Sequence, residues 1–392
     1  MRNTLRPEVI VKHRAVAVRG YFLSQTGVGD GSDERSVHPR IIGSVAEPFN
    51  RETLMRLPRL IRRVLLASLV VAAFGAGFLG RVVSDYLNAP LHRDATPRKL
   101  VISLGSGPAA IAAAFERAGL QVSAQRLPWI IRLRGDGSRY RAALYDVAPG
   151  QSLRAVLDAI ARGEGQAATV RLIEGITFRQ VREIIDLHPH VLADTRGLEE
   201  AALLLRIGIP HASGEGLFLP DTYHFAPGTS ALQLYREAWR AMERVLQSEW
   251  AARNPALPLQ SAYEALILAS MIEKETGRAQ DRAMIASVFV NRLRKGMLLQ
   301  SDPTTVYALG ASFDGRLRRR DLQLDHPHNT YMRPGLPPTP IALPGLASLR
   351  AAVRPEPTRA LYFVAKGDGR SAFSDNLDDH NRAVARYQLN RR

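Results

Sequence analysis

Two glutamates on either side of a lysine, Glu273, Lys274 and Glu275, are the residues of this sequence best placed to do acid–base chemistry. They come at the end of residues 261–277, which we expect to form one helix. Ser261 begins an S-x-x-E capping box, a common start of a helix. The helix therefore has to position at least one of the two carboxylates.

Glu275 continues the apolar face of this expected helix. Leu268, Met271 and Ile272 recur at the i, i+3 and i+4 spacing of one face, and Glu275 is the next position on it. A carboxylate in line with a buried face is costly unless it is paired or used in catalysis. The pattern alone favours an ion pair at the helix end over a catalytic role.

Polar side chains that could bind a polar ligand follow this helix, and others lie in a loop before it. The candidate binding residues are Gln300, Ser301, Asp302, Asn329 and Tyr331. The earlier loop, residues 214–225, carries Glu215, Asp221 and Tyr223, which we interpret as supporting the loop itself.

Neither a metal nor a cofactor is predicted. Cys is absent, which excludes a thiolate zinc site, a disulfide and a Cys nucleophile. His326 and His328 stand without the H-E-x-x-H spacing of a zinc hydrolase.

The composition describes a globular protein with a basic surface. Of 392 residues, 46% are hydrophobic and 23% charged, enough for more than one domain. The net charge of +16 could indicate nucleic acid, but 48 of the 53 basic residues are Arg, which is typical of an Arg-favouring genome. Because no Arg cluster alternates with aromatic residues, we expect no nucleic-acid partner.

An uncharged apolar run at residues 64–80 predicts a membrane span at 64–83. It is close to the roughly 20 residues that a bilayer core requires, and flanking Arg side chains can extend it. Five arginines lie just before the run and few after it, which predicts an N-terminus inside and a C-terminal part outside. Residues 1–63 form a cytoplasmic extension without periodicity, and Met55 is an alternative start.

The remaining pattern predicts an α+β fold in three further parts. Strands at 100–104, 127–133 and 145–147 alternate with two helices in a small domain, residues 98–165. A bridging segment, residues 166–213, contains a second capping box at Thr177. The C-terminal part, residues 214–392, has helices at 231–253 and 281–295, an irregular Pro-rich loop at 333–345, a hairpin at 361–374 and a short helix after His380.

Five segments in order resemble the YceG-like family of endolytic murein transglycosylases. They read EGLFLPDTY, ASMIEKETG, SVFVNRLRKGMLLQSDPT, NTYMRPGLPPTPIALPG and LYFVAKGDG. The resemblance is close over residues 214–387 and weaker over 100–175, where the family has a LysM-like module. One departure is at Ala142–Tyr145, where the family's A-G-x-Y lacks its Gly.

The resemblance implies a function and a catalytic residue. The family cleaves the MurNAc–GlcNAc bond of nascent peptidoglycan strands without water, leaving 1,6-anhydro-MurNAc ends and terminating strand elongation. Its catalytic acid and base is the second Glu of the triplet, here Glu275. It is anchored in the inner membrane with a periplasmic catalytic domain, beside peptidoglycan synthases as possible partners.

Two other functions remain open from the residues alone. The chain could be a peptidoglycan-binding scaffold in which the Glu is structural. It could also be a muramidase that uses two carboxylates, Glu275 and Asp302, as ordinary glycoside hydrolases do.

Overall fold

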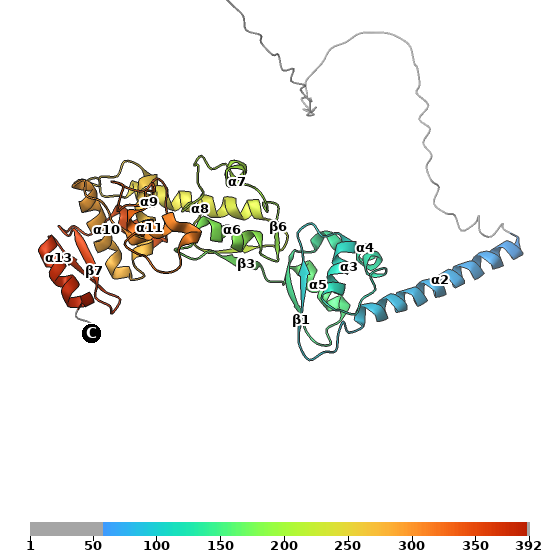
Figure 1. Cartoon of the computed structure of the whole chain (residues 1–392). Coiled ribbons are helices and arrows are strands. Elements are labelled where there is room, and N and C mark those ends of the chain that lie inside the picture. The colour runs from blue at the N-terminus through green and yellow to red at the C-terminus, as the bar shows by residue number, and fades with distance from the viewer. Residues whose placement is uncertain (1–57, 390–392) are drawn as a thin grey trace, which may run out of the picture. The chain divides into compact units, whose positions relative to one another are not determined.

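The computed structural model describes residues 58–389 (Figure 1). Most of the predicted N-terminal extension, and the possible start at Met55, lie outside the described residues. Helix α2 (Arg59–Asn88) contains the predicted span, and Leu60–Asn88 is long and apolar enough to cross a membrane. The prediction of one apolar helix here is confirmed, and the helix extends past 64–83 at both ends.

Residues 98–162 form a small α+β unit with its own core. Strand β1 (Arg98–Ile102) pairs antiparallel with β2 (Ala143–Val147), so that Leu100 lies opposite Tyr145, and both are buried. Helices α3 (Pro108–Arg117), α4 (Leu127–Arg134) and α5 (Leu153–Arg162) complete the unit. Ser152 caps α5 by accepting the Ala155 N–H, as its sequence predicts.

Residues 127–133 form a helix, so the predicted strand is wrong. In α4, Leu127, Ile130 and Ile131 are buried at i, i+3 and i+4, whereas Trp129 is 66% exposed. A short apolar run fits a strand or a buried helix equally well by periodicity. Pro128 in the first turn favours the helix, because its missing N–H is not needed there.

Residues 168–353 share one larger core. Strand β3 (Ala168–Arg171) pairs antiparallel with β5 (Thr222–Phe225), and β4 (Val191–Leu192) pairs parallel with β6 (Thr229–Ser230). Helices α6 (Phe178–Asp186) and α7 (Glu200–Ile207) pack into the same core as the C-terminal helices. The segment interpreted as a bridge therefore contributes to this core, and the Thr177–Gln180 capping box is confirmed.

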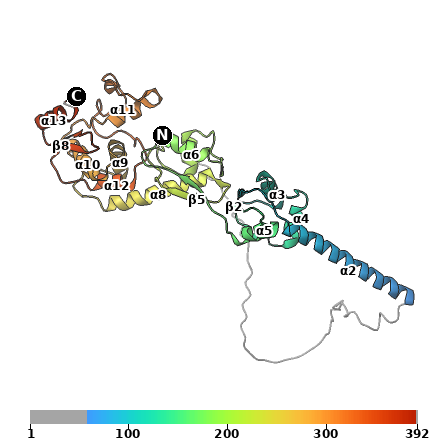
Figure 2. The same cartoon turned by 90° about the horizontal axis from the view of Figure 1, so that it is seen from below.

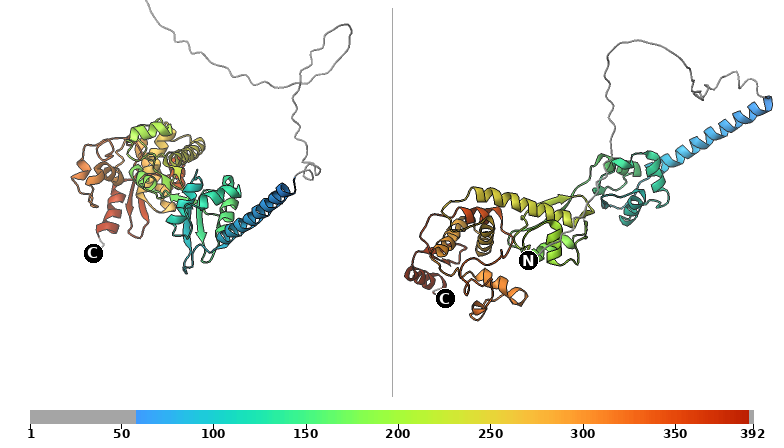
Figure 3. Two further views of the ribbon diagram at one scale, coloured as in Figure 1. Left: turned by 90° about the vertical axis from the view of Figure 1, so that its right-hand side faces the viewer. Right: turned by 90° about the horizontal axis from the view of Figure 1, so that it is seen from above.

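The centre of this core is α9 (Ala262–Glu275). It contacts α8 (Ala231–Ala251), α10 (Ala279–Arg294) and α12 (Leu346–Val353), as Figure 2 shows. Every residue from Ala265 to Ile272 is buried, so the helix is packed on all sides rather than along one apolar face. The long helix α8 runs beside it (yellow in Figure 3).

Residues after α10 surround one end of α9. Helix α11 (Asp302–Leu309) is followed by short 3₁₀ turns, and residues 333–345 contain no helix or strand, as predicted. Strands β7 (Tyr362–Ala365) and β8 (Ser371–Ser374) form the predicted hairpin. The last helix, α13 (Leu377–Val384), begins before His380 because Asn376 caps it by accepting the Asp379 N–H, a signal missed in the sequence. The π-helical turn Ala385–Leu389 follows it.

Candidate active site

Helix α9 presents Glu275 from its last position, directly after the buried segment. Ser261 caps the start of the helix by accepting the Glu264 N–H at 3.2 Å. The Glu264 carboxylate accepts the N–H of Gln260 instead of that of Ser261, so the predicted capping box is only half formed. Packing on all sides fixes the backbone beneath the Glu275 carboxyl group.

Ser301 holds the Glu275 side chain in place. Its hydroxyl donates to Glu275 Oε1 at 2.5 Å, and its own N–H donates to Thr330 Oγ1 at 3.0 Å. The preceding residue, Gln300, has a φ of +53°, a left-handed conformation that is uncommon for a residue other than glycine. Such strain persists where the surrounding structure enforces it, often at a functional site.

Burial raises the pKa of the Glu275 carboxyl group to about 7. The Ser301 hydroxyl opposes this shift because it stabilises the charged form, and the negative charge of Asp302 adds to it. A carboxyl group with a pKa near neutrality can be protonated before a reaction step and ionised after it. Glu275 therefore has the surroundings of a general acid and base.

Glu273 has a different environment, although it is only two residues away. One of its carboxylate oxygens accepts the Gly345 N–H at 2.9 Å and the Ser348 hydroxyl at 2.7 Å, at the start of α12. The other lies 3.4 Å from the Arg282 guanidinium, and both side chains are nearly buried. Glu273 therefore joins α9, α10 and α12, and its carboxylate is fully occupied by these contacts.

Three predicted sugar-binding residues lie around Glu275 with groups free for a ligand. The Tyr331 hydroxyl donates to Asp302 Oδ1 at 2.5 Å, and Asp302 is exposed. Gln300 is exposed, and its side-chain oxygen accepts from Arg292 at 3.2 Å. In the described part of the chain, no residue accepts from the Gln300 amide nitrogen.

Asn329 is not supported as a direct sugar ligand. It is fully buried, and its oxygen accepts from the Thr305 hydroxyl and the Tyr331 N–H, both at 3.0 Å. Its amide nitrogen donates to the carbonyls of Leu322 and Leu324. All its hydrogen-bonding capacity is used inside the protein, where it fixes the loop that carries Tyr331.

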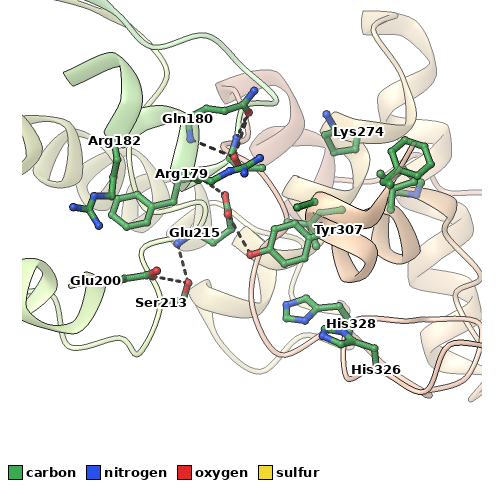
Figure 4. A pocket seen from close by; sticks show the side chains of 18 of the residues that line it. Arg179, Gln180, Arg182, Glu200, Ser213, Glu215, Lys274, Tyr307, His326 and His328 are labelled. Carbon is green, nitrogen blue, oxygen red and sulfur yellow. Dashed lines mark hydrogen bonds between the residues drawn. The ribbon is translucent and has the colours of Figure 1, made fainter. Parts of the chain in front are cut away.

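A cavity of about 1110 Å³ is lined in part by Lys274 and Asp302 (Figure 4). These two residues are the chain neighbours of Glu275 and Ser301, which do not themselves line it. Its other walls come from the start of α6, from the loop that carries Glu215, and from α11 and the His326–His328 segment. The cavity is large enough for more than a single sugar ring.

Glu215 is a second buried carboxyl group in this cavity. Its oxygens accept the Phe178 N–H at 2.9 Å and the Tyr307 hydroxyl at 3.2 Å, so it links the start of α6 to α11 (Figure 4). Burial raises its pKa to about 7. In the same loop Tyr223 donates to the Leu219 carbonyl at 2.7 Å, and Asp221 accepts the Thr222 N–H. These contacts fit the predicted supporting role of the three residues.

Comparison with known proteins identifies the family. Residues 100–386 match the YceG-like family. A Bacillus subtilis (strain 168) protein named endolytic murein transglycosylase is 30% identical over 326 residues, which are 76% of this chain and 87% of that protein. This chain belongs to the YceG-like family.

Other relatives match shorter or less similar stretches. Two Streptococcus pneumoniae proteins, also named endolytic murein transglycosylase, are 32% identical over 179 residues, which are 44% of this chain and 32% of theirs. A crystal structure of a putative YceG-like protein from Listeria monocytogenes is 29% identical, covers 74% of this chain and 99% of that one, and has a TM-score of 0.49.

The YceG-like segments meet at this site although they are distant in sequence. The segments EKE, QSDPT and NTY bring Glu275, Ser301 and Tyr331 together in the structure. Arg179 and His328 also line the cavity, and no feature of the sequence predicts them there. The capping box at Thr177 predicts where α6 begins. It does not predict which loop the start of α6 faces.

Proposed function

We propose that this protein is a membrane-anchored endolytic lytic transglycosylase that cleaves the MurNAc–GlcNAc bond of peptidoglycan. The observation that carries the proposal is the buried Glu275 carboxyl group, which the Ser301 hydroxyl contacts at 2.5 Å and whose pKa is raised to about 7. The names of the relatives support the same substrate and reaction.

Glu275 acts twice in the proposed reaction. Its protonated form gives a proton to the glycosidic oxygen as the bond from that oxygen to C1 of MurNAc breaks. The resulting carboxylate takes the proton of the C6 hydroxyl, whose oxygen bonds to C1 and closes the 1,6-anhydro ring. Glu275 ends protonated, as it began, and no water is consumed.

One carboxylate is enough because the nucleophile belongs to the substrate. The Ser301 hydroxyl holds the carboxyl group and stabilises its charged form between the two steps. Gln300, Asp302 and Tyr331 offer donors and acceptors to the sugars. Asn329 supports the loop of Tyr331.

A two-carboxylate muramidase is the second candidate, because Asp302 follows Ser301 and its charge acts on Glu275. In that reaction Asp302 would activate a water, and products would carry reducing ends. Asp302 also accepts a hydrogen bond from Tyr331 and helps to raise the pKa of Glu275. We therefore favour a role for Asp302 in setting the pKa of the catalytic acid.

The anchor determines which glycan the enzyme can reach. We propose that α2 spans the inner membrane with the N-terminus in the cytoplasm and residues after about 84 in the periplasm, because arginines such as Arg62 and Arg63 precede the apolar run. We assign residues 98–165 to a LysM-like module and residues 214–392 to the catalytic domain, whose core residues 166–213 join. A catalytic domain tethered there acts on nascent strands close to the bilayer, beside peptidoglycan synthases, and terminates their elongation.

The purified full-length protein in detergent is expected to release soluble fragments from isolated sacculi. Cleavage inside strands would shorten the long glycan chains before disaccharides accumulate, as chromatography of the glycans after removal of the peptides would detect. If no strand is shortened by a folded preparation, the protein is a scaffold and the proposal is wrong.

The pH dependence of cleavage is expected to follow the surroundings of Glu275. Because the acid must be protonated, kcat/KM should fall about tenfold per pH unit above roughly pH 7. Ser301→Ala removes a bond that stabilises the carboxylate, so this alkaline limb should move to higher pH. Asp302→Asn removes a repelling charge, so the limb should move to lower pH.

The two variants control for each other, since both alter the same end of α11. Measured pH–rate profiles that shift in the same direction, or that do not shift, would contradict the assignment of the limb to Glu275.

A further inference from the structure

We propose that the cavity beside Glu275 binds a carboxylate of the peptide carried by the muramic acid, through Arg179 and Lys274. The inference rests on the proposed function and adds a substrate preference to it: strands that bear acidic stem peptides should be cleaved faster than bare strands.

The cavity lies near the proposed catalytic carboxyl group. Lys274 and Asp302 line it, and the residues beside them in the chain, Glu275 and Ser301, are hydrogen-bonded to each other at 2.5 Å. A MurNAc residue held at Glu275 carries its peptide on the lactyl group at C3. A substituent attached at C3 can extend into the nearby space of about 1110 Å³.

Arg179 places an unneutralised charge at the cavity wall. It is exposed in the first turn of α6, where the helix dipole is positive and a cation is unfavourable. In the described part of the chain it makes no hydrogen bond or ion pair. An exposed arginine without a protein partner at a cavity wall is available to bind an anionic ligand.

Lys274 adds a second cation with spare donors. Its ammonium group donates to the Gly175 carbonyl at 3.1 Å, which uses one of its three N–H groups. The side chain is exposed and lines the same cavity as Arg179. Together the two groups can hold a carboxylate, with Arg able to bind it through two parallel hydrogen bonds.

Several other charged groups of the wall already have partners in the protein. Arg182 lies 3.6 Å from Asp186 and donates to the Leu198 carbonyl. Glu200 accepts from the Ser213 hydroxyl and the Gly214 N–H. Glu215 accepts the Tyr307 hydroxyl. Asp302 also lines the cavity, as an exposed carboxylate that accepts the Tyr331 hydroxyl. Arg179 and Lys274 are therefore the lining cations with unused donors for a ligand carboxylate.

The test compares three forms of one glycan preparation with the full-length protein in detergent. The first form carries its stem peptides, the second has the peptide carboxylates converted to amides, and the third has had its peptides removed by an amidase. For the wild type, kcat/KM should be about tenfold higher on the first form than on either other form, the effect of one charge-assisted hydrogen bond.

Arg179→Gln should reduce this preference for charged peptides several-fold, and Arg179→Lys should restore part of it. Lys274→Gln should reduce it independently. Arg240→Gln is the matched control: Arg240 is also an exposed arginine on a helix, but it lies outside this cavity, and its replacement should leave the preference unchanged.

The outcomes separate this inference from the proposed function. If the wild type cleaves all three forms equally, or cleaves the amidated form as well as the charged one, the inference is wrong and the proposed function stands. A preference that survives Arg179→Gln and Lys274→Gln also overturns it. If no form is cleaved, the proposed function itself fails.

Discussion

Replacing Glu275 with Gln is expected to slow the cleavage of glycan strands by about 10²–10⁴-fold. The amide keeps the shape of the side chain and can still accept the Ser301 hydrogen bond, but it cannot donate a proton to the leaving oxygen. Release of glycan fragments from sacculi measures the effect. A variant that cleaves as fast as the wild type would leave Glu275 without a catalytic role.

Glu275→Gln should also stabilise the folded protein at alkaline pH. This result would distinguish a loss of activity from a loss of folding. Because the folded-state pKa of Glu275 is raised to about 7, the folded protein holds this proton more tightly than the unfolded chain. The wild type therefore loses stability as the pH rises from the unfolded pKa through 7. Glu275→Gln should melt at a higher temperature than the wild type at pH 8, by an amount equivalent to roughly 1–3 kcal/mol. The two should melt alike below the unfolded pKa.

Glu273→Ala, in contrast to Glu275→Gln, is expected to lose much of the free energy of unfolding. It leaves the nearly buried Arg282 without its charge partner, a change that typically costs about 3–5 kcal/mol. It also leaves the Gly345 N–H and the Ser348 hydroxyl without their acceptor. The midpoint of thermal unfolding should fall by about 10 °C, as measured by circular dichroism in detergent.

Glu273→Gln is the conservative control, because its amide oxygen can still accept at the start of α12 and only the charge is lost. It should be less destabilised than Glu273→Ala and should retain cleavage activity. If Glu273→Gln folds normally but is inactive while Glu275→Gln is active, the roles of the two glutamates have been exchanged.

The sequence could predict Glu275 as an unusual carboxylate, but not which of two glutamates would be free. Both lie in the last turn of one helix, and the difference comes from partners far along the chain. Glu273 meets Gly345 and Ser348, whereas Glu275 meets Ser301. Only the folded arrangement of α9, α11 and α12 separates a structural carboxylate from a reactive one.

Local signals predicted elements well where a cap or turn residue marked them. The caps at Ser152 and Thr177 and the hairpin of β7 and β8 formed as expected. The run at 127–133 could not be assigned from its sequence, because five apolar residues in a short stretch fit the periodicity of a strand and of a helix. The periodicity of α9 predicts a single apolar face, but the helix is buried on all sides. Periodicity reflects the spacing of apolar residues and does not indicate how many neighbours surround a helix.

Asn329 and Arg179 show why the role of a site residue could not always be predicted from the sequence. An asparagine in a loop is a plausible sugar ligand by type, but its four hydrogen bonds to the protein could not be foreseen from spacing. Arg179 reads as an ordinary solvated charge in the sequence. Its position at the cavity depends on the packing of α6 against the loop of Glu215.

Cleavage of sacculi in water enriched in the heavy isotope of oxygen tests the central claim most directly. If Glu275 alone serves as acid and base and the C6 hydroxyl is the nucleophile, mass spectrometry should find anhydro-MurNAc ends that contain no heavy oxygen. Glu275→Gln should produce almost none of these ends. New reducing ends that carry the heavy isotope would show that water is the nucleophile, and would contradict the account.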